Sequence, residues 1–195
     1  MEFRHLVQQA RTHSLRRTPG TGRRLAGGQS PTALFITCAD SRIVTTAITG
    51  AEPGNLFELR TAGNVIPAYD PDSASGEIAT IEFAIVQLGV SEVVVCGHSH
   101  CGAVAALHSD RAALDHLPNM RRWLASHAGF SPCAEPDRAL RAEGQRHVLA
   151  QLAALHDYPF VRERVDSGAV RLHGWFYDIE SGEVLAHRAD LFQPL

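Results

Sequence analysis

The stretch "EVVVCGHSHCGAVAAL", residues 92–107, changes character in its middle. The segment EVVVC is apolar and β-branched, which predicts a buried strand, and the residues after it turn into a helix. His98 and Cys101 lie three residues apart at this junction, so both side chains can reach one point. The glycines at 97 and 102 let neighbouring backbone come close there. A strand that leads directly into a helix indicates an α/β fold.

The rest of the chain repeats this alternation of strand and helix. Ile78, Ile81, Ile85 and Leu88 form an apolar stripe at helical spacing, and Gly89 follows as a helix-ending residue. The segments that we expect to be regular are the strands TALFIT (32–37) and NLFELR (55–60), the helices at 73–88, 119–127 and 138–156, and a closing strand and hairpin in AVRLHGWFYD and SGEVL. This order predicts a central, mostly parallel β-sheet flanked by helices.

A second stretch, "FITCADSRIVT" (35–45), carries Cys38, Asp40 and Arg42 at alternate positions. In an extended chain, alternate side chains point to the same side. Sites in parallel sheets form beyond the carboxyl ends of the strands, and both Cys38 and His98 follow apolar runs that predict strands. We therefore expect the two stretches to meet at one edge of the sheet.

Cys38, His98 and Cys101 together offer two thiolates and one imidazole. Three protein ligands with one open position are typical of catalytic zinc, whereas structural zinc sites normally have four. Zinc lowers the pKa of bound water toward ~7 and so supplies hydroxide at neutral pH. Asp40 is placed to accept a hydrogen bond from that hydroxide, and Arg42 to hold Asp40 in a bidentate pair.

Other roles for the cysteines and for one histidine remain open at this point. A disulfide between Cys38 and Cys101 is one alternative, although a chain of this length without a secretory signal favours metal binding or catalysis. Cys96 reads as a small hydrophobe within a strand, and Cys133 lies in a Pro-rich loop with no evident role. His100 is a rival ligand, but the turn should point it away from the other two groups. The other nine histidines lack ligand spacing and are interpreted as surface or core residues.

Composition and charge describe an ordinary globular protein with a basic beginning. The 195 residues are 45% hydrophobic with a net charge of −3, contain no apolar run of the ~20 residues that span a bilayer, and show no signal-peptide pattern. We expect a cytoplasmic protein without a membrane partner. Residues 1–28 hold six arginines and one acid, a charge of +5, which leaves −8 on the remainder.

The predicted organisation is a basic N-terminal arm, residues 1–30, and a single zinc-binding catalytic α/β domain, residues 31–195. The arm has no interleaved aromatic residues on which bases could stack, so we expect no nucleic-acid partner. Its charge favours an arm that lies on the acidic body of the same chain or of a partner subunit.

Three spaced motifs resemble the signatures of the β-class carbonic anhydrases. They are CADSR, RTAGN (60–64) and GHSHCGA (97–103), and EFAIVQLGVSEVVVCGH and GWFYD (174–178) are similar to that family's flanking pattern. The resemblance covers roughly residues 32 to 185. It implies an α/β zinc enzyme that reversibly hydrates carbon dioxide to bicarbonate and a proton by zinc-bound hydroxide.

Carried over by position, the resemblance assigns roles to five residues. Cys38, His98 and Cys101 would be zinc ligands, and Asp40 and Arg42 a catalytic dyad. In some members that aspartate becomes a fourth zinc ligand in a closed, inactive state, so Asp40 is also counted among the metal ligands. The family is built on dimers, which predicts a homodimer or a multiple of dimers here.

The sequence departs from the family pattern in a few places. Thr45 and Thr46 stand where Pro and an acid are frequent, and Glu52 stands where one branch has a substrate-facing Gln. A bicarbonate-binding regulatory pocket in some members uses Trp, Arg and Tyr. Arg60 and Tyr177 match two of these positions, but Phe35 replaces the Trp, so the resemblance to that pocket is incomplete.

Three other functions compete with this reading. The same fold could serve a zinc hydrolase of carbon disulfide or carbonyl sulfide, which are also small, linear and apolar. A zinc deaminase would need H-x-E and P-C-x-x-C, and neither motif is present. A non-enzymatic bicarbonate or redox sensor would be favoured by loss of Asp40 or Arg42, and both are present.

Overall fold

The computed structural model describes residues 2–18, 20–133 and 135–195, and the chain divides into two compact units, residues 1–30 and 31–195. The first unit contains the helices α1 (Phe3–Arg11) and α2 (Thr21–Ala26), with the 3₁₀-helix η1 (His13–Arg16) between them. No described residue of these three helices is buried. The side chains of Phe3 and Leu6 on α1 are 77% and 53% exposed, so this helix has an uncovered apolar face.

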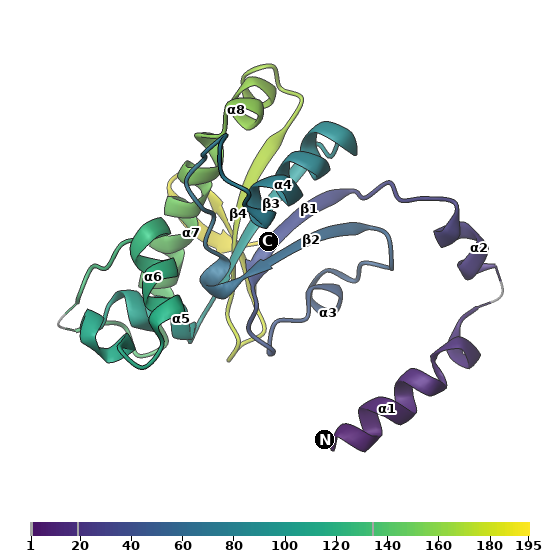
Figure 1. Cartoon of the computed structure of the whole chain (residues 1–195), viewed down its shortest axis with the longest axis horizontal. Coiled ribbons are helices and arrows are strands. Elements are labelled where there is room, and N and C mark those ends of the chain that lie inside the picture. The colour runs from purple at the N-terminus through teal and green to yellow at the C-terminus, as the bar shows by residue number, and fades with distance from the viewer. Residues whose placement is uncertain (1, 19, 134) are drawn as a thin grey trace. The chain divides into compact units, whose positions relative to one another are not determined.

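The second unit is built on one six-stranded sheet in the order β2-β1-β3-β4-β5-β6. Its strands are β1 (Ala33–Cys38), β2 (Leu56–Thr61), β3 (Glu92–His98), β4 (Arg171–Tyr177), β5 (Val184–Arg188) and β6 (Leu191–Pro194). The first four strands in this order are parallel to one another, and β5 and β6 are antiparallel additions at one edge. The predicted α/β class with a mostly parallel sheet is therefore confirmed (Figure 1).

Helices connect and cover the strands. They are α3 (Thr45–Thr49), the 3₁₀-turn η2 (Ala62–Asn64), α4 (Gly76–Glu82) with the π-helical turn η3 (Phe83–Gln87), α5 (Gly102–Leu107), the 3₁₀-helix η4 (Arg111–Leu114), α6 (Pro118–His127), α7 (Arg141–His156) and α8 (Pro159–Asp166). α4, α7 and α8 lie on the same side of the sheet (Figure 1). No helix in the described part of the chain is both long enough and apolar enough to cross a bilayer.

Two predicted helices begin later than expected, and local hydrogen bonds explain both shifts. α4 begins at Gly76 because the Ser75 hydroxyl accepts the Ile78 N–H and caps the helix. α7 begins at Arg141, whose N–H donates to the Asp137 carboxylate at 2.7 Å. The residue before it, Leu140, is left-handed with φ 54° and so cannot belong to the helix.

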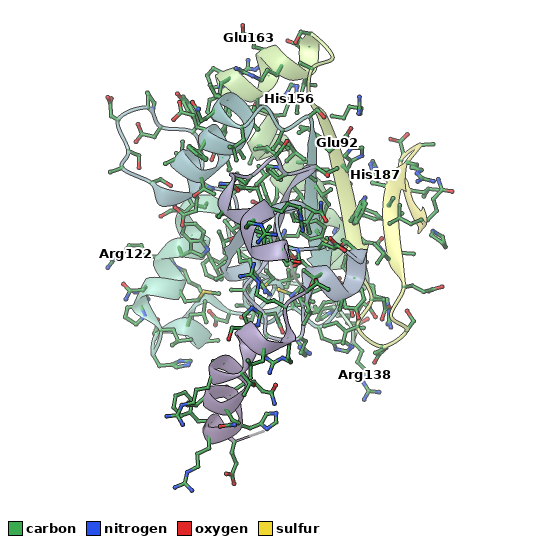
Figure 2. All side chains as sticks on the ribbon, turned by 90° about the vertical axis from the view of Figure 1, so that its right-hand side faces the viewer. Glu92, Arg122, Arg138, His156, Glu163 and His187 are labelled. Carbon is green, nitrogen blue, oxygen red and sulfur yellow. The ribbon has the colours of Figure 1, made fainter. Side chains whose placement is uncertain are left out.

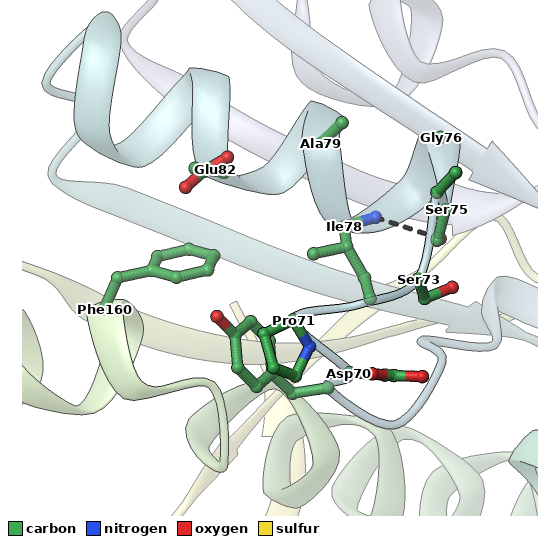
Figure 3. A pocket seen from close by; sticks show the side chains of 11 residues that line it. Asp70, Pro71, Ser73, Ser75, Gly76, Ile78, Ala79, Glu82 and Phe160 are labelled. Carbon is green, nitrogen blue, oxygen red and sulfur yellow. Dashed lines mark hydrogen bonds between the residues drawn. The ribbon is translucent and has the colours of Figure 1, made fainter.

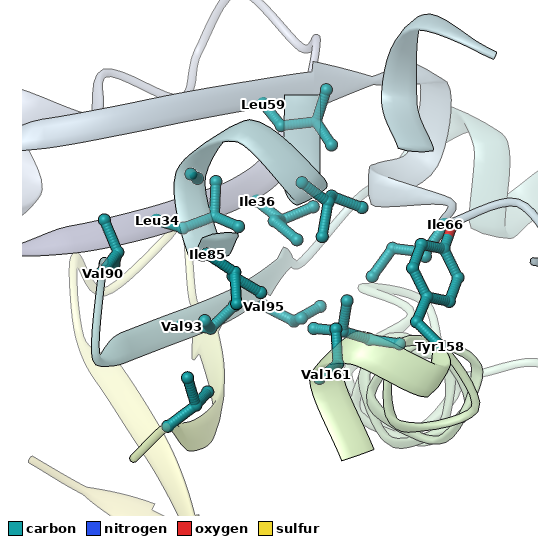
Figure 4. Close-up of a cluster of buried hydrophobic side chains, with 14 of the residues drawn as sticks. Leu34, Ile36, Leu59, Ile66, Ile85, Val90, Val93, Val95, Tyr158 and Val161 are labelled. Atoms are coloured by element: carbon teal, nitrogen blue, oxygen red, sulfur yellow. The ribbon is translucent and has the colours of Figure 1, made fainter. Parts of the chain in front are cut away.

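The main hydrophobic core lies between the sheet and the helices α4, α7 and α8 (Figure 4). Leu34 and Ile36 of β1 and Val93 and Val95 of β3 are fully buried there. They contact the buried stripe of α4, to which Ile81 belongs, together with residues of α7 and α8. Because both central strands are covered, their apolar runs are continuous rather than alternating.

Glycines allow α7 to lie unusually close to the sheet. A Cβ on Gly97 of β3 would stand 2.6 Å from a Val148 methyl carbon, and a Cβ on Gly144 of α7 would stand 2.6 Å from the Phe176 ring. No real Cβ tolerates such contacts, so only glycine permits this approach. The close contact fixes α7 relative to the strands that carry the site described below.

Charged side chains lie mostly at the periphery of the second unit. Figure 2 shows Arg122 on α6 and Glu163 on α8 pointing away from the body, and both are exposed.

A smaller buried cluster lies around α5 and α6 and includes Val104, Leu124 and the two cysteines Cys38 and Cys101. The two cysteines thus belong to this second cluster and not to the main core.

Candidate metal and catalytic site

The candidate ligands lie at one edge of the sheet, at the carboxyl ends of β1 and β3. β1 ends at Cys38 and β3 ends at His98, and the two strands are parallel neighbours. Cys101 is the residue that precedes the first turn of α5. The two Sγ atoms and one ring nitrogen of His98 all lie within 4.8 Å of one another, and the three residues are at most 6% exposed.

The two sulfurs fit a shared metal better than a disulfide. They are 4.0 Å apart, roughly twice the ~2.0 Å length of an S–S bond, and both cysteines are free. Two sulfurs at Zn–S bonds of ~2.3 Å on a tetrahedral ion would stand about 3.8 Å apart. The disulfide alternative is therefore wrong for Cys38 and Cys101 in this structure.

His98 has the hydrogen-bonding pattern of a metal ligand. Its Nδ1 donates to the Ser99 carbonyl at 2.9 Å, which leaves Nε2 as the unprotonated nitrogen of the neutral ring. Nε2 is buried and has no hydrogen-bond partner in the described structure. A buried acceptor without a hydrogen-bond partner lowers the stability of the folded state. In this tautomer the Nε2 lone pair is available to bind a metal ion.

The thiols also fit a cation. The pKa of Cys38 is lowered, mainly because Cys101 donates a hydrogen bond to it, whereas the same hydrogen bond, together with burial, raises the pKa of Cys101. Two buried thiols at this distance therefore share one negative charge. A divalent cation would allow both to ionise, so the residues present fit zinc.

Asp40 and Arg42 form a two-pronged ion pair, but not on an extended chain. β1 stops at Cys38, and the Arg42 N–H donates to Asp40 Oδ1 while the Ile43 N–H donates to the Asp40 carbonyl, which makes a tight turn. Residues 39–42 are therefore not extended, and the same-side argument for an extended chain does not apply to them. The turn forms because an Asp side chain competes with the strand for backbone donors. Within it, Arg42 still donates twice to the Asp40 carboxylate, at 3.0 and 2.7 Å.

This pair determines the charge and position of Asp40. The Arg42 guanidinium holds the pKa of the Asp40 carboxyl well below its usual range, so the group is ionised at neutral pH. Asp40 Oδ2 lies 3.9 Å from His98 Nε2. The carboxylate thus stands directly beside the unpartnered nitrogen.

A second arginine shapes the turn. Arg60 donates to the carbonyls of Cys38, Asp40 and Ile43 at 2.8–3.1 Å. The Arg60 guanidinium is therefore engaged in hydrogen bonds to the backbone. Phe35, which stands at the Trp position of the regulatory pocket in some family members, is fully buried, with its ring 5.9 Å from that of Trp175. These contacts show Arg60 as a support of the Asp40 turn.

The remaining sequence candidates lie outside the Cys–His–Cys group. The His100 ring pairs with Glu180 at 3.2 Å, while its carbonyl accepts from Arg42 at 2.9 Å. Cys96 is fully buried within β3, and burial raises its pKa to about 12. Cys133 is exposed.

Sequence reasoning did not single out two residues close to the group. The Gly63 N–H donates to Cys38 Sγ at 3.4 Å, and the Gly63 carbonyl accepts from His147 Nε2 at 2.8 Å. His147 had been grouped with the surface or core histidines. The one available signal was its place in a buried stripe of α7, with Gly144 and Gln151 at helical spacing.

A cavity of about 410 Å³ lies elsewhere in the described structure. It lies between α4 and the start of α8 and is lined by Asp70, Ser75, Glu82 and Phe160, among others, and by none of the site residues above (Figure 3). Its two carboxylates and lack of basic side chains make it unsuited to an anion such as bicarbonate.

Fold and site together define a class: an α/β protein whose neighbouring parallel strands end in a buried Cys–His–Cys group beside an Asp–Arg pair. Comparisons with known proteins agree. Residues 33–184 match the family model described as carbonic anhydrase. A carbonic anhydrase of Pseudomonas aeruginosa is 44% identical over 170 residues, which cover 82% of this chain and 74% of that protein.

Solved structures give the same result. The β-carbonic anhydrase CcaA superposes with a TM-score of 0.81 at 33% identity, over 96% of this chain and 85% of that one. A tetrameric β-carbonic anhydrase of Sordaria macrospora gives a TM-score of 0.69 at 27% identity, over 97% and 94%. The chain belongs to the β-carbonic anhydrase family.

Proposed function

We propose that this protein is a zinc-dependent carbonate dehydratase that reversibly hydrates carbon dioxide to bicarbonate and a proton. The observation that carries the proposal is the convergence of Cys38, Cys101 and the unpartnered His98 Nε2, with the Asp40–Arg42 pair beside them. Membership of the carbonic anhydrase family supports it.

The three ligand residues would hold the metal. A zinc ion bound there acts as a Lewis acid that lowers the pKa of a water molecule and so supplies hydroxide at neutral pH. The Cys38 and Cys101 thiolates balance the charge of the cation, and the Ser99 carbonyl fixes the His98 tautomer.

Asp40 orients the attacking oxygen. Its carboxylate is ionised and lies next to His98 Nε2, so it accepts a hydrogen bond and directs the oxygen lone pair at the carbon of the substrate. Arg42 keeps Asp40 in this position through its two-pronged contact. If Arg42 released Asp40, the carboxylate would be free to serve as a fourth metal ligand, which would be a closed state.

Stopped-flow kinetics with three substrates tests this proposal. We expect the zinc-loaded protein to turn over carbon dioxide faster than carbonyl sulfide or carbon disulfide at equal concentrations. Faster turnover of a sulfur compound would assign the alternative hydrolase function. No turnover of any of them by protein that contains about one zinc per chain would contradict the enzymatic proposal and favour a sensor.

The assembly and location expected from the sequence are part of the proposal. We propose a homodimer or a multiple of dimers, which is supported by the tetrameric β-carbonic anhydrase among the structural relatives. A cytoplasmic location stays a prediction.

A further inference from the structure

We propose that His147 is a positioning residue that tunes the metal site through Gly63 and Cys38. The inference rests on the proposed zinc site, and it concerns a histidine that contacts none of the three ligands directly in the described hydrogen bonds. His147 holds the Gly63 carbonyl, and the N–H of the same glycine donates to the sulfur of Cys38.

The link consists of two hydrogen bonds across one residue. A carbonyl can only accept, so His147 Nε2 carries the proton in its 2.8 Å contact with Gly63 O. The amide of the same glycine donates to Cys38 Sγ at 3.4 Å, an ordinary distance for a bond to sulfur. The carbonyl and the N–H of Gly63 belong to successive peptide groups, so the imidazole restrains the residue whose N–H donates to the sulfur of a candidate metal ligand.

Only glycine fits at position 63, between the His147 ring and the Cys38 sulfur. Its φ is 77°, in the left-handed region, and a Cβ there would stand 2.7 Å from the Ala103 Cβ. The backbone must pass that close to α5 for its N–H to reach Cys38. A flexible glycine at this point needs an external contact to hold its peptide groups in place.

Several side chains hold this loop, and His147 provides the contact at Gly63. Trp123 Nε1 donates to the Ala62 carbonyl at 3.1 Å, and the Ile66 N–H donates to Gln151 Oε1 at 2.7 Å. Gln151 and His147 lie one turn apart on α7, so that helix holds the loop at two places.

The environment of His147 suits a permanent donor. The residue is 8% exposed, and α7 is fixed against β3 and β4 by the close contacts of Gly97 and Gly144. Burial lowers the pKa of His147, with His108 acting in the same direction, so the ring stays neutral with its proton on Nε2. The ring also borders a cavity of about 150 Å³, whose lining includes His108 and Glu143.

The hydrogen bond from Gly63 would change how much charge the Cys38 thiolate donates to the metal. Two thiolates donate more charge to a metal than neutral ligands would, which makes the site less able to acidify water. An N–H bond to Cys38 withdraws part of that charge and stabilises the thiolate over the thiol. Hydrogen bonds of this outer kind typically change metal affinity or activity by about 10–100-fold.

The test uses full-length protein with the zinc replaced by cobalt(II), whose sulfur-to-metal charge-transfer band reports the charge on the sulfurs. The variant His147→Leu removes the donor, and His147→Gln restores an N–H of similar reach. Because leucine leaves the Gly63 carbonyl unsatisfied, His147→Met provides a more adaptable apolar replacement if the leucine variant does not fold. His156→Leu, at the C-terminal end of α7 (Figure 2), is the matched control.

We expect the apolar variants to shift the band to longer wavelength and to weaken zinc binding about tenfold or more in a chelator competition. The glutamine variant and the control should resemble the unchanged protein in both measurements. An unshifted band and unchanged zinc affinity in a folded apolar variant would overturn this inference alone. Absence of any charge-transfer band in the unchanged protein would overturn it together with the proposed zinc site.

Discussion

At the scale of single residues, the proposed mechanism depends on how Asp40 and Arg42 hold the attacking oxygen. The Asp40 carboxylate receives two hydrogen bonds from the guanidinium and one from the Arg42 backbone, so one charged geometry is strongly preferred. Asp40→Asn keeps an acceptor oxygen but loses the charge and can present an NH₂ group instead. We expect carbon dioxide hydration to fall by about 10²-fold or more while zinc content stays unchanged.

Stopped-flow rates and elemental analysis on the same samples check this prediction. Near-normal hydration by Asp40→Asn would mean that the pair supports the turn and not the reaction. Loss of zinc from the variant would mean that Asp40 is needed to hold the metal.

His147 also predicts how stability depends on pH. Its folded-state pKa lies below the ~6.5 of an unfolded histidine, mainly because it is buried. Below pH ~6.5 the unfolded chain therefore binds more protons at this residue than the folded protein does. The stabilising contribution is present above that pH and is lost as the pH falls toward the folded-state value.

Urea unfolding at pH 8 and pH 5.5 of the unchanged protein and of His147→Gln measures this contribution. The unchanged protein should lose more of its free energy of unfolding between the two pH values than the variant does. An equal loss in both would show that His147 is protonated as readily in the folded state as in the unfolded chain.

The meeting of Cys38, His98 and Cys101 could be predicted because neighbouring parallel strands end at one edge of a sheet. The turn at Asp40 was not predicted, because its local hydrogen bonds end the strand at Cys38 and a distant arginine supports it. Arg60 stabilises the turn by donating to three backbone carbonyls, and the sequence around Asp40 does not indicate this contact. His147 was missed for the same reason, since its partner Gly63 lies 84 residues away.

At the scale of elements, the approach of α7 to the sheet is the feature on which the site most depends. A Cβ on Gly144 would overlap the fully buried Phe176 ring at 2.6 Å and lie 3.5 Å from the His98 carbonyl. Overpacking of this kind costs about 1–3 kcal/mol, against ~1 kcal/mol gained when alanine replaces glycine in a helix. We expect Gly144→Ala to lower the free energy of unfolding, measured by urea denaturation.

Gly76→Ala is the matched control, because Gly76 lies in the first turn of α4 and a Cβ there meets no atom within 4 Å. It should leave stability unchanged or raise it by about 0.4–1 kcal/mol. Equal stability of the two variants would mean that α7 can move away from the sheet without cost.

Long, strongly patterned elements were predictable, and short ones were not. The apolar runs of β1 and β3 and the stripe of α4 led to correct assignments. The five-residue helix α3, the helix α8 and the edge strand β6 carry too few patterned residues to stand out from the loops around them. Helix starts at Gly76 and Arg141 were fixed by capping contacts rather than by hydrophobic period.

At the scale of the whole molecule, charge is divided between the two units. Residues 1–28 carry +5 and the remainder −8, and α1 presents exposed Phe3 and Leu6. We expect light scattering to give a dimer or a multiple of dimers at micromolar concentration. Removal of residues 1–30 should weaken this association, and high salt should weaken it in the full chain, because exposed charges are screened. A fully active monomer would contradict the predicted assembly.

The central claim is that Cys38, His98 and Cys101 hold the zinc that makes this chain a carbonic anhydrase. The most direct test is to titrate zinc into zinc-depleted protein while following carbon dioxide hydration by stopped flow, with Cys101→Ala in parallel. The account predicts that activity rises in proportion to zinc and levels off at about one ion per chain, and that Cys101→Ala gains little. Full activity without zinc, or no activity in protein that has bound one zinc per chain, would contradict it.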